Sequence, residues 1–179
     1  MQKLEGTTLG PLARADPTRV LYNALVPFAV AALEHFFGQA FRIFLRYDKR
    51  AQRRLLEQSR KVEFSDAMSL AANTKSIEDI VADWYSFQNI DSIHRAFNEW
   101  FGIDIWKLLR QRRKVGKRID WLEKRLENPI DFRHGVVHRF ELNLDLNRAG
   151  IEELLDLSIL VIETFVDYVQ SSLGEKIRD

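Results

Sequence analysis

The chain has 179 residues and no cysteine, which is long enough for one domain with a substantial core, or at most for two small domains. Its 27 lysines and arginines against 26 aspartates and glutamates give a formal charge of +1, which excludes a polycation that binds nucleic acid over its whole surface. Any electrostatic affinity must therefore come from local patches. The lack of cysteine also excludes disulfides and thiolate metal sites.

The longest uncharged run of the sequence is Val20 to Leu33, and Glu34 and His35 end it. This run is shorter than the roughly 20 apolar residues that a bilayer span needs. Its position and its flanking residues do not suit a signal peptide. The sequence therefore predicts a cytoplasmic protein without a membrane segment.

Apolar residues recur at helical spacing along nearly the whole chain, and no convincing alternating strand is found. This pattern predicts an all-α fold, a bundle of four to five main helices with additional short helices. Residues 1–15 are expected to be a flexible lead-in, and residues 16–179 a single helical domain. Asp16 followed by Pro17 predicts a first helix that runs to about Tyr47, in which Pro27 is a kink or a restart.

The first helix is expected to be central, because apolar side chains surround most of its circumference. These are Leu21, Leu25, Phe28, Ala32, Phe36, Phe37, Phe41 and Phe44. Shorter helices are expected over residues 50–61, 65–72, 76–88 and 91–101. Another begins at residue 102 and continues or restarts within residues 116–128.

Two late helices complete the prediction. Asn128-Pro129 repeats the pattern of a capping residue and a first-turn proline, so a helix is expected to begin at Pro129. The last helix is expected to begin after Asn147, to reach about Ser172 and to stop at Gly174. It carries two apolar stripes, which fit either a second subunit on one face or a helix buried on both.

The stretch "IDFRHGVVHRF", residues 130–140, holds two of the four histidines of the chain. On a helical wheel one half is apolar, formed by Ile130, Phe132, Val136, Val137 and Phe140. The other half holds Asp131, His134, Gly135, His138 and Arg139. Arg133 is the exception, because it falls in the middle of the apolar half, where an arginine is costly unless it is paired or opens onto a cleft. Glu34 is one candidate for such a partner.

Several interpretations of these residues are open. The histidines fit ordinary solvated side chains, or a zinc site, because residues four apart on a helix can share one ion. A third ligand would then come from Asp131, His35, His94 or a distant acid. An arginine and a histidine together also suit metal-free RNA cleavage, in which a base takes the 2′-hydroxyl proton and the guanidinium stabilises the charge at phosphorus.

The six residues from Arg133 to His138, "RHGVVH", resemble the R-x4-6-H motif of the HEPN superfamily, and the similarity extends from about residue 20 to about residue 172. The resemblance implies a helical bundle that forms a homodimer, with one composite, metal-independent endoribonuclease site and no cofactor. It implies Arg133 and His138 as catalytic residues and His134 as a residue that orients them or touches substrate. It also implies a toxin or antiviral defence effector, with an antitoxin or a larger defence assembly as partner.

One position departs from the family pattern. HEPN toxins that are silenced by nucleotidylation carry a tyrosine two residues after the motif histidine, and here that residue is Phe140, which has no hydroxyl to modify. Another branch of the family has lost nuclease activity. The second interpretation is accordingly a non-catalytic HEPN module that binds nucleotide or RNA, or that serves as a dimerisation unit.

A basic run lies upstream of the motif. The stretch "RQRRKVGKR", Arg110 to Arg118, has six basic residues in nine. It fits either a solvated helix end or a track for the RNA backbone. Under the second interpretation, the substrate-binding residues are Arg112, Arg113, Lys114, Lys117 and Arg139. The four tryptophans of the chain, Trp84, Trp100, Trp106 and Trp121, are interpreted as core or interface residues.

Overall fold

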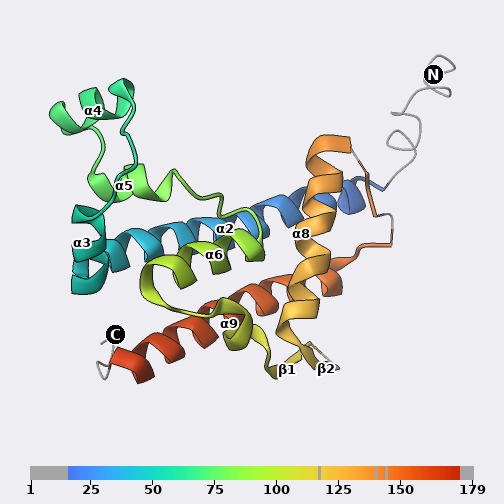
Figure 1. Ribbon diagram of the computed structural model, residues 1–179. Helices are drawn as coiled ribbons and strands as arrows, with labels where there is room; N and C mark the ends of the chain where they lie inside the picture. The colour runs from blue at the N-terminus through green and yellow to red at the C-terminus, as the bar shows by residue number, and fades with distance from the viewer. Residues whose placement is uncertain (1–15, 117, 140, 144, 174–179) are drawn as a thin grey trace, which may run out of the picture. The chain divides into compact units, whose positions relative to one another are not determined.

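The computed structural model describes residues 16–116, 118–139, 141–143 and 145–173, with only the backbone of 127, 128 and 173. The predicted lead-in, residues 1–15, lies outside this range. The fold is all-α apart from one small hairpin, as predicted (Figure 1). The elements in chain order are α2 (Pro17–Tyr47), α3 (Lys49–Leu56), α4 (Phe64–Ala71), α5 (Ile77–Ala82), α6 (Ile90–Phe101), α7 (Ile105–Leu109), β1 (Arg112–Val115), β2 (Arg118–Trp121), α8 (Leu122–Arg139) and α9 (Arg148–Leu173).

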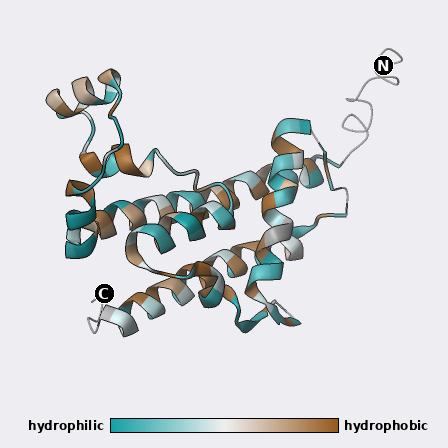
Figure 2. Ribbon diagram, in the orientation of Figure 1, coloured by the Kyte–Doolittle hydropathy of each residue, from teal (hydrophilic) through white to brown (hydrophobic). Residues whose placement is uncertain are grey.

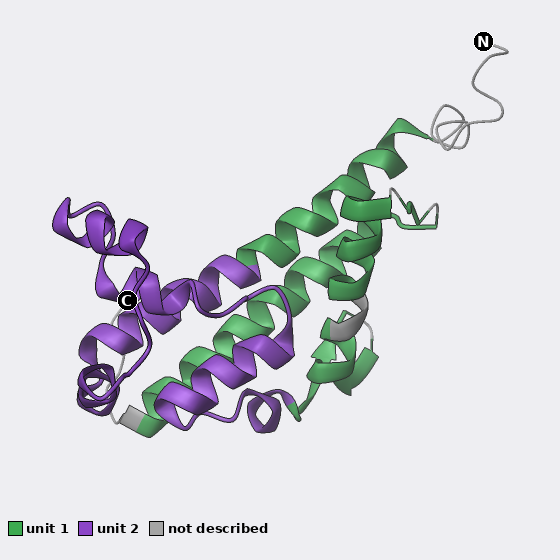
Figure 3. Cartoon of the chain, turned by 45° about the horizontal axis from the view of Figure 1, so that its top comes forward, with its two compact units in different colours: residues 1–32, 110–179 green, residues 33–109 purple. Residues whose placement is uncertain are grey.

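The chain divides into two compact units (Figure 3). The first, called unit 1, is formed by residues 1–32 and 110–179, and the second, unit 2, by residues 33–109. Helix α2 contributes residues to both units. Unit 1 therefore consists of two stretches of chain that are separated in sequence by the whole of unit 2.

Unit 2 is built around aromatic rings. Phe41 on α2 is fully buried, and its ring centroid lies 5.7 Å from that of Phe97 and 6.4 Å from that of Trp100, both on α6. The rings of Phe101 and Phe87 lie 5.3 and 5.5 Å from Phe41. Mostly edge-on and tilted arrangements of this kind add about 0.5–1.5 kcal/mol per pair beyond the burial of area. We call Phe37, Phe41, Phe97 and Trp100 the aromatic core.

Charged side chains of unit 2 fasten its short helices. Arg42 on α2 donates a hydrogen bond to Asp79 on α5 over 2.7 Å. Asp79 also accepts hydrogen bonds from the backbone and the hydroxyl of Ser76, which together with Arg42 lower the pKa of its carboxyl. Helix α4, by contrast, has no buried residue, although Figure 2 shows that its sequence is largely hydrophobic.

Unit 1 contains a buried cluster of aliphatic side chains. It is formed by Val26, Ala29, Val30, Ile151 and Leu154, and we call it the small core. Tyr22, Ile130, Phe132 and Leu146 pack against it and are partly buried. The small core joins the first half of α2 to α9 and to the C-terminal half of α8.

The first half of α2 is less buried than its composition predicts. Leu21 and Phe28 are 58% and 71% exposed, whereas Phe37, Phe41 and Leu45 are buried. In the second half of α2, Ile43 and Tyr47 are 56% and 74% exposed. The prediction of a central helix is therefore wrong: α2 buries one face along its length, and its other face is exposed. Pro27 lies inside α2, and the helix continues through it.

The predictions about residues 102–129 are partly wrong. The helix that begins near residue 102 does not continue through the basic run, because α7 ends at Leu109 and strands β1 and β2 form an antiparallel hairpin. The alternative, a restart within residues 116–128, agrees with the start of α8 at Leu122. A helix was expected to begin at Pro129, but α8 begins at Leu122 and contains Pro129 in its interior. The local Asn-Pro pattern was misleading because the buried side chains of Leu122 and Leu126 anchor the turns that precede it.

Helix α9 agrees with its predicted bounds, and Figure 2 shows hydrophobic and hydrophilic segments alternating along it. Gly174, its expected stop, lies outside the described residues. Both apolar stripes contribute to one broad buried face, formed by Ile151, Leu154, Leu157, Ser158, Val161, Thr164, Phe165 and Val169. Leu155 and Ile159 are 47% and 55% exposed, so apolar side chains also occur outside that face.

By length and composition, α2 is the one helix of the described residues that could cross a membrane. The core helix of a soluble protein has the same length and composition, as does a signal sequence near the N-terminus. The cytoplasmic location stays a prediction.

Candidate functional site

Helix α8 presents the motif residues because only one of its faces is anchored. Ile130 and Phe132 pack against the small core. Side chains on the opposite side of the helix are therefore expected to face solvent. Asp131, His134 and His138 are exposed, as the helical wheel predicts.

The two histidines of the motif lie against each other. Their ring centroids are 4.5 Å apart, and the ring planes are tilted by 48°. One turn of helix separates His134 from His138, which brings side chains four residues apart onto the same face. The structure thus brings together two of the three residues that the resemblance assigns to catalysis.

Arg133 lies on a different side of α8. At about 100° per residue, its Cα is about 140° around the helix axis from that of His138, and about 7.5 Å along the axis. Its side chain is half-buried and takes part in an interaction, so it is not a free guanidinium. Within one chain, the helix does not bring Arg133 onto the face that His138 occupies.

The C-terminal end of α8 is closed by Glu141. The backbone N–H of Glu141 donates to the carbonyl of Gly135 over 3.2 Å, and its carboxylate lies 3.1 Å from the guanidinium of Arg139. A Cβ on Gly135 would lie 2.8 Å from the same carboxylate, so a glycine permits this close approach. Gly135 is accordingly buried, although the wheel placed it on the polar half. Phe140, the position of the family tyrosine, lies outside the described residues.

Asn23 is not among the predicted site residues, yet its side chain positions the segment after α8. It is fully buried on α2, and its amide donates to the carbonyl of Asn143 over 2.9 Å and to that of Arg19 over 2.8 Å. Its side-chain oxygen accepts from the backbone N–H of Asn143 over 2.7 Å. An asparagine inside an apolar run was the available signal, because a buried amide must find partners.

The basic hairpin formed by β1 and β2 has an exposed face that carries both basic and apolar side chains. In its register Arg112 pairs with Trp121, and Lys114 with Ile119. Directly opposite residues of an antiparallel pair point to the same side, so these four side chains share one face, which we call the hairpin face. Trp121 is 38% and Ile119 64% exposed, so Trp121 is not a core residue, and its interpretation as an interface residue stays a prediction.

The remaining basic residues of the hairpin are placed differently. Arg113 pairs with Asp120 on the other side and donates to the side chain of Gln111 over 3.0 Å. Val115, also on that side, is buried. The two strands are joined at Gly116, whose φ of 58° suits a glycine in a tight turn. Lys117, the fourth predicted substrate-binding residue of this run, lies outside the described residues.

The hairpin adjoins the N-terminal end of α8 (Figure 1), whereas His134 and His138 belong to its C-terminal part. Helix rise places Leu122, which follows the hairpin directly, about 24 Å along the axis from His138. The structure therefore does not gather Arg112, Arg113 and Lys114 around the histidines. Of the predicted substrate-binding residues that are described, only Arg139 lies next to them.

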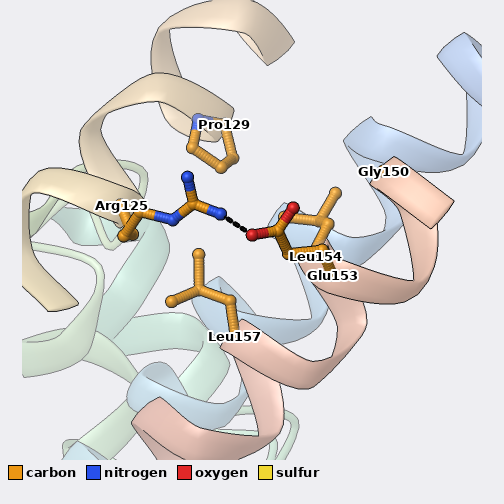
Figure 4. Close-up of a pocket in the computed structure, with 6 residues that line it drawn as sticks. All are labelled: Arg125, Pro129, Gly150, Glu153, Leu154 and Leu157. Carbon is orange, nitrogen blue, oxygen red and sulfur yellow. Dashed lines mark hydrogen bonds and ion pairs between the residues drawn. The ribbon is translucent and has the colours of Figure 1, made fainter. Parts of the chain in front are cut away.

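A small pocket of about 140 Å³ lies between α8 and α9 (Figure 4). Arg125 on α8 forms an ion pair with Glu153 on α9 at its edge, and Pro129, Gly150, Leu154 and Leu157 complete the lining. Ligand sites of drug-like size are typically about 300–1,000 Å³, so this pocket is too small for a nucleotide. This pocket is therefore not the candidate site, which is the exposed surface of α8 that carries the histidines.

No three histidine, aspartate or glutamate side chains within the described ranges come together in a way that could hold a metal ion. The third ligand that a structural zinc site would require is thus not found among these residues. In comparisons with protein-family models, curated proteins and solved structures, nothing matches the chain. The resemblance to HEPN domains rests on the motif and the order of the helices alone, and it stays a prediction.

Proposed function

We propose that the protein is a metal-independent endoribonuclease of the HEPN type. The observation that carries the proposal is the pair of exposed, adjacent imidazoles of His134 and His138, presented on a helix that is anchored from the opposite side. Exposure leaves both rings accessible to a polymeric substrate. Histidine is also the side chain best suited to moving a proton near neutral pH.

The proposed reaction uses the internal nucleophile of RNA. His138 takes the proton from the ribose 2′-hydroxyl. The 2′-oxygen attacks the adjacent phosphorus, and the bond from phosphorus to the 5′-oxygen breaks. The leaving 5′-oxygen takes a proton from the solvent, to which His138 returns its own, and the products are a 2′,3′-cyclic phosphate and a 5′-hydroxyl. Arg133 stabilises the negative charge at phosphorus, and His134 orients His138 or touches the substrate.

In a homodimer, Arg133 of one copy could lie close to His138 of the other, although the two residues are on different sides of α8 within one chain. Because Arg133 and His138 point to different sides of one helix, a composite site would combine residues from two copies of the chain. Unit 1 also exposes apolar side chains that could form such an interface. They include Leu21, Leu25, Phe28, Val137, Leu155 and Ile159.

The hairpin face supports binding to RNA rather than to a small molecule. Arg112 and Lys114 can neutralise phosphates, and the indole of Trp121 offers a surface on which a base can stack. The distance of about 24 Å along α8 from this face to His138 suits a polymer that contacts both ends of the helix. Arg139 would contact the strand next to the histidines.

The cellular role that goes with this proposal is that of a cytoplasmic toxin or defence effector. An antitoxin or a larger assembly would then keep it inactive until it is needed. This role follows from the resemblance to HEPN nucleases.

The proposal is tested with a structured RNA and a DNA of the same sequence, both incubated with the protein in excess EDTA. We expect wild type to cut the RNA, to leave 2′,3′-cyclic phosphate ends and to spare the DNA. His138→Ala should be slower by about 10²–10⁴-fold, the usual contribution of a general acid or base. Arg133→Ala should lose a similar factor.

His35→Ala is the matched control, because His35 is an exposed helical histidine outside the motif. It should cut at the rate of wild type. If wild type, His138→Ala and Arg133→Ala are equally inactive on every RNA that is tried, the nuclease proposal fails.

A second candidate function is a non-catalytic module that binds RNA or nucleotide. The half-burial of Arg133 and its existing interaction favour this alternative, because they fit an arginine that supports the fold. It predicts that RNA binds with a strong dependence on salt and is not cut. In that case Arg112→Ala should weaken binding, and His138→Ala should leave it nearly unchanged.

A further inference from the structure

The adjacent imidazoles of α8 have a second chemical property besides proton transfer. Both rings are exposed, their centroids are 4.5 Å apart, and both belong to one regular helix. Imidazole nitrogen is a preferred ligand of zinc, copper and nickel, and not of magnesium or calcium. We propose that His134 and His138 form a two-histidine site for one such transition-metal ion.

The spacing of the two side chains fits a chelate. Zinc–nitrogen bonds of about 2.0–2.1 Å at a tetrahedral angle place two ligand nitrogens about 3.4 Å apart. Rings whose centroids are already 4.5 Å apart reach that separation through side-chain rotation alone. Because both side chains are exposed, this rotation displaces no packed neighbour. The helix fixes both Cα atoms in advance, so binding costs little backbone ordering.

The site is open rather than closed. No third metal-binding side chain joins the pair among the residues that the structure describes. The carboxylate of Glu141, which follows the end of the helix, is engaged with Arg139 at 3.1 Å. The remaining coordination positions would therefore be filled by water. An ion held by two protein ligands exchanges readily, in contrast to a closed, four-ligand structural zinc.

Occupation of this site has a consequence that rests on the proposed nuclease function. A metal ion bound to His138 uses the lone pair that the imidazole needs in order to accept the 2′-hydroxyl proton. Zinc would therefore inhibit RNA cleavage, and EDTA would restore it. The enzyme would need no metal for catalysis and would be switched off by one.

The test measures zinc binding to the full chain by isothermal titration calorimetry, without RNA. Wild type is compared with His134→Ala, His138→Ala, His35→Ala and His94→Ala. We expect saturable binding to wild type and an affinity lower by about tenfold or more in His134→Ala and His138→Ala. Loss of a supporting group alone often costs 10–100-fold in metal affinity, and loss of a direct ligand costs at least as much.

The two remaining histidines supply the controls. His94 is the sharper one, because its Nδ1 lies 3.4 Å from a carboxylate oxygen of Asp104 and could itself attract a metal ion. Both controls should bind zinc as wild type does. Circular dichroism of each variant establishes that a loss of binding is not a loss of folding, since two exposed side chains are not expected to support the helix.

The proposal is overturned if wild type does not bind zinc, or if only His94→Ala or His35→Ala weakens binding. A separate assay of RNA cleavage, with and without zinc, distinguishes the two proposals. Zinc binding through His134 and His138 without any cleavage would retain the metal site and remove the nuclease. Cleavage that zinc does not affect would retain the nuclease and remove the inhibitory role.

Discussion

The two compact units differ in where their large and reactive side chains lie. In unit 2, Phe41 is fully buried, with ring contacts to helix α6. In unit 1 the small core is aliphatic, while the imidazoles of His134 and His138 face outward. The aromatic core secures the fold of unit 2, whereas α8 in unit 1 carries residues whose removal should cost little stability. The candidate catalytic side chains thus lie on an exposed helix face of unit 1, whereas the aromatic core of unit 2 is buried.

The difference in burial between the two units should be largest in its effect on stability at two phenylalanines of α2. Phe41→Ala removes a fully buried ring and should lower the free energy of unfolding by about 3–5 kcal/mol, because a cavity remains. Phe28→Ala removes a ring that is 71% exposed and should cost about 0.5 kcal/mol or less. Urea denaturation followed by circular dichroism measures both changes.

Since a change of that size could unfold a marginally stable protein, Phe41→Leu serves as a milder variant that should lie between wild type and Phe41→Ala. Equal effects at the two positions would contradict the comparison. They would mean that Phe28 is also buried in solution.

The next largest effect on the free energy of unfolding is expected at Asn23, the buried asparagine of unit 1. Asn23→Ala removes three hydrogen bonds and leaves both backbone groups of Asn143 without this partner. We expect a loss of about 2 kcal/mol, because three hydrogen bonds of a buried amide are lost, while the exposed Asn143 can turn to water for partners. Asn98→Ala, at an exposed helical asparagine, should be nearly neutral. Thermal denaturation of the two variants gives the comparison, and similar melting temperatures would refute the role of Asn23.

In unit 2, the titration of Tyr85 should make the stability of the fold depend on pH above about pH 10. Burial, with a hydrogen bond to Glu99, raises the pKa of Tyr85 to about 12, and the indole N–H of Trp100 donates to its oxygen over 2.8 Å. The folded state then keeps a proton that the unfolded state loses above pH 10. This contribution to stability is fully present below about pH 10 and is lost as the pH rises to about 12.

The expected loss over that window is up to about 2 kcal/mol, reduced by the partial exposure of the ring. Urea midpoints at several pH values measure it. In Tyr85→Phe the decline between pH 10 and 12 should be shallower than in wild type. Parallel curves for the two proteins would show that Tyr85 does not titrate in this way.

The smallest effect is expected at the end of α8. Arg139 and Glu141 are 61% and 57% exposed, so their ion pair is screened and should contribute about 0.5 kcal/mol or less. Arg139→Ala should leave the melting temperature almost unchanged, as should Glu141→Ala. Under the proposed function, only Arg139→Ala should weaken RNA binding, with a shallower dependence on salt. A large change in melting temperature would show that this end of the helix is structural.

Much of the helical framework could be predicted from local sequence. The bounds of α2 and α9 follow from their apolar periodicity and from the cap at Asp16, whose side chain accepts a hydrogen bond from the N–H of Thr18 over 2.9 Å. The hairpin could not be predicted in the same way. Its strands are four residues long and rich in charge, and they are stabilised by pairing with each other and by contact with α8 and α9.

The candidate site was only partly predictable for the same reason. A helical wheel is sufficient to place His134 and His138 side by side and outward, because their relation depends on one helix alone. It also identified Arg133 as unusual. The wheel could not show that Glu141 folds back over Gly135, or that Asn23 binds the segment after α8. Both contacts depend on a chain reversal that no local pattern specifies.

The division of unit 1 into two stretches of chain has a consequence for synthesis on the ribosome. Residues 33–109 are complete in sequence before any of α8 or α9 has been made, so unit 2 can begin to fold while unit 1 has only the first half of α2. The small core needs Ile151 and Leu154, which are synthesised only after the whole of unit 2 and after α8. A nascent chain would therefore carry an unsupported motif helix until α9 arrives, and an incomplete chain would lack an ordered site.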